Sequence, residues 1–205
     1  MKRKFIFLLL VLFTGILITG CSLKTSKDDD IDISNIDNKS FVIDKDSIIT
    51  IDNNNRLSVS TESIKKNMIN TGRFYEGKIF NLEDGTYDAR FYLDKYNDDQ
   101  EGIASLFYNV KNNPKNSTEI VSYNFSKENF EKYKDNIYWG LEVILSIFDV
   151  DGTEDIYKTI EKNAKTTSTS QLGDDYECYQ NEGKNIRVIC ANLKYAIQID
   201  IRTID

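Results

Sequence analysis

Residues 126–148, SKENFEKYKDNIYWGLEVILSIF, decide the fold. Ser126 is a residue type that commonly caps the start of a helix. After it, apolar side chains recur three and four residues apart, the period of one helical face, at Phe130, Tyr133, Ile137, Leu141, Ile144 and Phe148. The second half of the stretch is apolar around most of its circumference, which is typical of a buried helix. We therefore predict a helix over about 127–148 that packs against a sheet.

Stretches that alternate apolar and polar residues lie on both sides of this helix. The clearest are 87–93 and 195–201, and the alternation is typical of half-buried strands. Further strands are predicted at 41–43, 48–51, 57–60, 74–80, 103–110, 119–125, 176–180 and 186–191, and further helices at 61–70 and 154–164. Strands joined by short turns pair antiparallel. The expected fold is α+β, with an antiparallel sheet (a meander plus the C-terminal strands) packed in two layers against two central helices.

The first twenty residues have the layout of a secretory signal peptide. Met1-Lys2-Arg3-Lys4 is a short cationic start, an apolar run extends from Phe5 to Ile18, and two small residues follow. The apolar run is shorter than the roughly 20 residues that a membrane-spanning helix needs. We therefore predict a cleaved signal peptide at residues 1–20.

The segment Ile18-Thr19-Gly20-Cys21 resembles the lipobox of bacterial lipoproteins. The resemblance covers only about the first 21 residues, and it implies cleavage between Gly20 and Cys21 and a diacylglyceryl group on the Cys21 thiol. Two acyl chains anchor a protein stably where a single chain detaches. The chain is thus expected at the extracytoplasmic face of the cell membrane. Residues 21–39, with an acidic centre at 28–30, would form a flexible tether, and residues 40–205 a single α+β domain.

The remaining two cysteines, Cys178 and Cys190, flank a Gly-containing turn. If this hairpin is centred on Lys184, the two cysteines are equally far from the turn and face each other directly across the strands. Neighbouring Cα atoms in such a pair lie about 4.5 Å apart, within the range that a disulfide accepts. An exported domain meets an oxidising setting. We predict a disulfide that stabilises the hairpin, the alternative being two buried thiols.

The chain contains no histidine. Nucleophile activation by histidine is therefore excluded, and so are the common zinc sites, which leaves carboxylate chemistry. The acidic stretch 149–155 lacks the glycine and glutamate spacing of a calcium-binding EF-hand loop. It is interpreted as a joint between helices, capped by Asp151 or Thr153, and 94–101 as an exposed acidic hairpin tip. Neither a metal nor a cofactor is predicted.

The formal net charge of −7 indicates which partners to expect. Nucleic acids and anionic lipids attract clustered lysine and arginine, so neither is expected as a partner. The chain has 12 tyrosines and 11 phenylalanines, and aromatic side chains are frequent both in strands and at interfaces. Tyr92 and Tyr108 are therefore either packing residues or an outward-facing binding strip.

Together, the anchor and the absence of a catalytic motif favour a non-catalytic module that binds an unknown protein or envelope component. Two alternatives remain open. One is an accessory role in assembly of the envelope or of a spore coat. The other is a glycosidase-like hydrolase that uses paired carboxylates.

Overall fold

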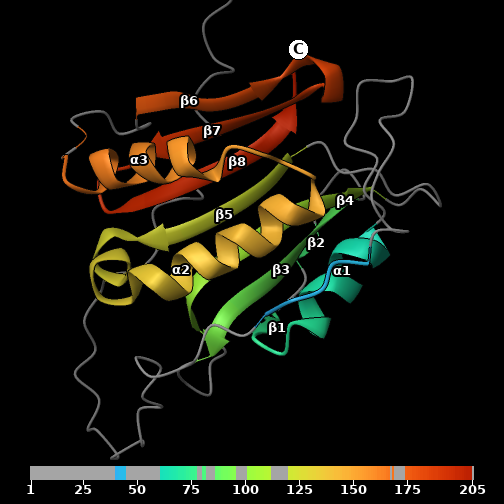
Figure 1. Ribbon diagram of the computed structural model, residues 1–205. Helices are drawn as coiled ribbons and strands as arrows, with labels where there is room; N and C mark the ends of the chain where they lie inside the picture. Colours follow the sequence, from blue (N-terminus) through green and yellow to red (C-terminus); the bar gives the residue numbers. More distant parts are fainter. Residues whose placement is uncertain are drawn as a thin grey trace, which may run out of the picture.

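The computed structural model describes residues 40–44, 61–77, 80–81, 86–95, 101–111, 120–166, 168 and 174–204. Within these residues the chain forms one eight-stranded sheet and three α-helices (Figure 1). The helices are α1 (Thr61–Asn70), α2 (Lys127–Ile147) and α3 (Thr153–Ala164). The strands are β1 (Phe74–Glu76), β2 (Phe80–Asn81), β3 (Thr86–Lys95), β4 (Gly102–Lys111), β5 (Ile120–Ser126), β6 (Asp174–Asn181), β7 (Ile186–Asn192) and β8 (Ala196–Thr203).

The sheet is built from two meanders that meet at β5 and β8. The spatial order is β1-β3-β4-β5-β8-β7-β6, and β2 also pairs with β3. Every pairing is antiparallel. The helices α2 and α3 connect the first meander to the second. The predicted α+β fold, an antiparallel sheet packed against helices, is confirmed.

Alternate residues of the strands form the core beneath the helices. Phe91 on β3, Tyr123 on β5 and Ile199 on β8 are each at most 1% exposed. Figure 1 shows α2 and α3 on one face of the sheet, with α2 against β4 and β5 and α3 against β6 and β7. Burial of apolar side chains from both layers is the main favourable contribution to folding.

The start of α2 follows the sequence prediction. The Ser126 side chain accepts a hydrogen bond from the backbone N–H of Asn129 at 2.9 Å, as an N-cap does. Within the helix, Tyr133 has non-helical dihedrals (φ −128°, ψ 35°), so the first turns are offset from the rest by a kink. The predicted cap of α3 is wrong, because its N-cap is Gly152 at φ 80°, which offers no side-chain hydrogen bond.

Several predicted strand boundaries need correction. The strand predicted at 74–80 is two short strands, β1 and β2, that both pair with β3. Residues 41–43 form no strand. The backbone N–H of the neighbouring Asp44 donates a hydrogen bond to Asn67 Oδ1 at 3.0 Å. The strands predicted at 48–51 and 57–60 lie outside the described residues.

The two tyrosines of the predicted binding strip lie on opposite faces of the sheet. Register places Tyr92 opposite Ser105 and Tyr108 opposite Ala89. Tyr108 points toward the helices, is 3% exposed and stacks on Phe91 with ring centroids 6.4 Å apart. The alternative of a shared outward strip is therefore wrong, because Tyr108 pairs with Ala89, which lies three positions from Tyr92 and so on the opposite face of the sheet.

The acidic stretch 94–101 begins in the protein interior. Asp94 is 3% exposed and forms an ion pair with Arg73, which is 4% exposed. Arg73 Nε donates to Asp94 Oδ1 at 2.8 Å, and its guanidinium lies 4.1 Å from the centre of the Trp139 ring. The prediction of an exposed tip is thus wrong for Asp94, because a buried arginine compensates its charge. Residues 96–100 lie outside the described part of the chain.

Candidate functional site

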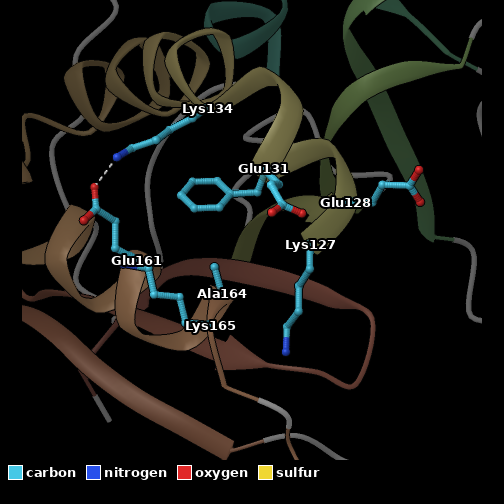
Figure 2. A pocket seen from close by; sticks show the side chains of 8 residues that line it. Lys127, Glu128, Glu131, Lys134, Glu161, Ala164 and Lys165 are labelled. Carbon is cyan, nitrogen blue, oxygen red and sulfur yellow. Dashed lines mark hydrogen bonds and ion pairs between the residues drawn. The ribbon is translucent and has the colours of Figure 1, made fainter.

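A pocket of about 550 Å³ lies between the beginning of α2 and the end of α3 (Figure 2). The two helices bring it together from opposite ends, because the first turns of α2 lie beside the last turn of α3. Its lining residues are Lys127, Glu128, Phe130, Glu131 and Lys134 from α2, and Glu161, Ala164 and Lys165 from α3 and its C-cap. Its volume falls within the roughly 300–1,000 Å³ of small-molecule sites.

Aromatic rings from α2 and α3 pack against one another beneath the pocket. Phe130 packs edge-on against Tyr138, with ring centroids 5.5 Å apart. Tyr138 in turn stacks on Tyr157 of α3 at 4.0 Å. Because these rings join the two helices directly, they hold the walls of the pocket at a set separation. Phe130 and Ala164 give the pocket its apolar lining.

One wall of the pocket carries an ion pair between the two helices. The Lys134 ammonium contacts the Glu161 carboxylate, and the Tyr138 hydroxyl lies 3.3 Å from the same carboxylate. The hydrogen bond from Lys134 lowers the pKa of Glu161, while burial and then Glu161 raise the pKa of Tyr138. A general acid of a glycosidase needs a raised carboxyl pKa. Glu161 shifts in the opposite direction.

Lys127 stands on the other wall, directly after the N-cap of α2. Its ammonium donates a hydrogen bond of 2.7 Å to the backbone carbonyl of Thr166, just beyond the end of α3. Partial burial lowers the pKa of Lys127. An ammonium has three donors, so two remain for a ligand.

Glu131 and Lys165 also contribute charges to the pocket, and Lys165 lies near enough to Glu161 to help lower the pKa of that carboxyl. Considering only the residues that the structure describes, neither side chain makes a hydrogen bond or an ion pair. Figure 2 shows Glu131 on the α2 wall and Lys165 across from it at the end of α3. Charged groups of both signs therefore surround a small apolar surface, which is the composition of a binding site.

The two cysteines predicted to pair lie on β6 and β7, and both are thiols in the structure. Cys190 is opposite Tyr176, and the register shifts by a β-bulge between Glu177 and Tyr179. The prediction that Cys178 directly faces Cys190 is therefore wrong, because the bulge accommodates Cys178 as an extra residue.

The bulge nevertheless leaves the two thiols in contact. The Cys178 thiol donates to the backbone carbonyl of Tyr176 at 3.4 Å, and the interaction between the two thiols raises the pKa of Cys178 and lowers that of Cys190. Cys190 is fully buried, whereas Cys178 is partly exposed. The predicted pair thus remains adjacent in space although its register is different.

The acidic loop between α2 and α3 holds a lysine from the second meander. Lys184 Nζ lies 2.6 Å from the Asp149 carbonyl oxygen, 2.7 Å from Asp149 Oδ2 and 3.5 Å from Asp151 Oδ2. The hydrogen bond with Asp149 raises the pKa of Lys184. The Lys184 ammonium therefore compensates part of the negative charge of this loop. Across the described ranges, no three acidic, cysteine or histidine side chains gather into a metal site.

Gly20 and Cys21 lie outside the described residues. Among the residues that the structure does describe, none of the helices has the length and apolar character needed to cross a membrane.

The pocket itself was not anticipated from the sequence. Its charged residues belong to the polar faces of two helices, where a charge usually contacts only solvent. The single available signal was the proximity of Lys127 and Glu131 to a helix start, and this does not indicate which helix end lies nearby. Comparison with other proteins adds no relative, since no family model, no curated protein and no solved structure matches the chain.

Proposed function

We propose that this chain is a bacterial lipoprotein, anchored through diacylglyceryl-Cys21 at the extracytoplasmic face of the cell membrane. The sequence Ile18-Thr19-Gly20-Cys21, after a cationic start and a short apolar run, supports this proposal. A double acyl anchor would hold the domain at the membrane for long periods.

The domain, in this proposal, is a non-catalytic binding module for a component of the cell envelope. The observation that carries the binding role is the pocket between α2 and α3. It combines an apolar base with charged groups of both signs, and its rings connect both walls. Such preorganisation lowers the entropic cost of binding.

Replacement of the proposed lipidation residue tests the anchor. Cys21→Ala should leave the precursor unprocessed or release the protein from the membrane fraction, and it should abolish metabolic labelling with palmitate. Ser22→Ala, a change at the neighbouring residue, is the matched control and should keep normal processing. Normal processing and membrane retention of the Cys21 variant would contradict the proposal.

Cross-linking in intact cells tests the binding role. The Glu131→Gln/Lys165→Gln variant should lose cross-linked species that the wild type forms. Glu154→Gln/Lys158→Gln removes an exposed ion pair on α3 outside the pocket and should retain them. Identical cross-links from wild type and pocket variant would refute the pocket as the binding surface.

A further inference from the structure

We infer that the pocket between α2 and α3 binds a small zwitterion with an apolar group, an amino acid or short peptide whose ammonium and carboxylate are both free. This inference rests on the proposed binding role and specifies the ligand. Three features of the pocket support it, and they are its cationic groups, an anionic side and an apolar base.

Lys127, on α2, and Lys165, at the C-cap of α3, provide the cationic groups of the pocket. The Lys127 ammonium is held in place by the carbonyl of Thr166 at 2.7 Å. This contact orients the ammonium and leaves two of its donors available. Lys165 extends from the C-cap of α3 into the same pocket. A carboxylate can accept hydrogen bonds from both, and bonds to charged groups are stronger than neutral ones.

Glu131 forms the anionic side, together with Glu128 one turn earlier on α2. Glu161, in contrast, is committed to Lys134. The Glu131 carboxylate accepts no hydrogen bond from any residue that the structure describes. It therefore has its acceptor sites available for a ligand ammonium.

The balance of charge excludes ligands of a single sign. With Lys134 and Glu161 paired, the lining holds the cations Lys127 and Lys165 and the carboxylates Glu128 and Glu131. A bound simple anion would lie near the carboxylates, and a simple cation near the ammonium groups. Like charges close to a ligand charge disfavour its binding. A zwitterion supplies a partner for each sign.

The apolar base accounts for the rest of the ligand. Phe130 and Ala164 line the pocket together with the charged side chains. Phe130 is 6% exposed and Ala164 is partly buried, so the pocket offers a small apolar surface, on which one aliphatic or aromatic side chain can pack. The volume of about 550 Å³ admits a single amino acid and also a short peptide.

Titration of the mature, lipidated chain in detergent micelles tests the inference. The probes are leucine, phenylalanine and the dipeptide Leu-Leu, each compared with its N-acetyl and its C-terminal amide form, with binding measured by saturation-transfer NMR and calorimetry. Blocking either charge should weaken binding by about tenfold or more, because one side of the pocket then faces an unpaired group. The comparison of leucine with Leu-Leu distinguishes an amino acid from a peptide.

Two variants identify which side chain of the pocket binds each charged group of the ligand. Glu131→Gln should lose most of the difference between a probe and its N-acetyl form, and Lys165→Gln most of the difference between a probe and its amide. Glu154→Gln/Lys158→Gln should bind like the wild type, since this pair is exposed on α3 outside the pocket.

The outcomes separate this inference from the proposed function. Equal binding of the free and charge-blocked probes overturns the zwitterion, even if the pocket variants weaken both. If no probe binds while the pocket variant still loses its cellular cross-links, the ligand class is wrong and the binding role stands. If no probe binds and the cross-links also persist in the pocket variant, both fail.

Discussion

Asn163 donates a hydrogen bond from its side-chain amide to the Sγ of Cys190, 3.3 Å away, and so ties the last turn of α3 to β7. Cys190 therefore lies between an amide on one side and the Cys178 thiol on the other. Both neighbours lower its pKa, the Cys178 thiol more strongly than the Asn163 amide. The position of this sulfur is thus determined by contacts from two elements.

Under the proposed export, oxidation should join Cys178 and Cys190. The two cysteines lie on neighbouring strands β6 and β7, and their thiols are close enough to shift each other's pKa. Alkylation of the denatured, unreduced protein should label neither residue, and alkylation after reduction should label both. The disulfide should add about 3 kcal/mol of stability or less. Two reactive thiols in the unreduced chain would contradict this prediction.

Breaking the buried ion pair should destabilise the domain strongly. Asp94→Asn leaves the Arg73 charge in an interior where both side chains are under 6% exposed. The expected loss in free energy of unfolding is about 3–5 kcal/mol, measured by denaturant titration. Lys158→Ala, which removes an exposed and solvent-screened pair, should cost much less. A loss of similar size in the two variants would show that the buried pair contributes no more to the free energy of unfolding than the exposed pair.

Gly140→Ala should also destabilise the domain, although alanine favours helices. A Cβ atom at this position would lie 2.6 Å from the Tyr123 hydroxyl and 2.7 Å from a methyl carbon of Leu93. Overpacking of this kind costs about 1–3 kcal/mol, against a gain of up to about 1 kcal/mol in helix propensity. Thermal unfolding measures the difference. A raised melting temperature would show that β3 and β5 can move away from α2.

Alkaline pH should unfold the domain partly through Tyr157. Burial raises its pKa to about 12, from a value of 10.0 for the unperturbed side chain. The folded state thus favours the neutral phenol. Its contribution to stability is complete below about pH 10 and is lost as pH rises toward 12.

Denaturant titrations between pH 8 and 12 check this dependence, since Tyr157→Phe should flatten the decline above about pH 10. Tyr195→Phe is the control, because that ring is 71% exposed and should leave the decline unchanged. An unaltered decline in the Tyr157 variant would assign the alkaline loss to other groups.

The main elements could be predicted because each has a strong local pattern. The apolar period around Ile137 and Leu141 indicates α2, and both residues are fully buried. The alternation at 87–93 indicates β3, which spans Thr86–Lys95. These patterns depend only on the period of one element, which the sequence displays directly.

The remaining features depend on relations between elements. The bulge at Cys178 changes the register by one residue, and no local pattern marks it. Burial of Asp94 depends on Arg73, 21 positions earlier in the chain. The pocket depends on the way that two helices cross a sheet. Each of these is a tertiary relation, and a single sequence without relatives does not display it.

The place of β8 in the sheet has a consequence for the order of folding. It is the last of the described strands along the chain, yet it lies between β5 and β7. Until it is present, the first meander ends at β5 with an unpaired edge, and the β6–β7 hairpin has no neighbour on its inner side. Nearly the whole domain must therefore be synthesised before all strands of the sheet can pair. The nascent chain consequently remains incompletely folded for most of its synthesis. Such delayed closure is compatible with the proposed export, in which a chain would cross a narrow channel unfolded.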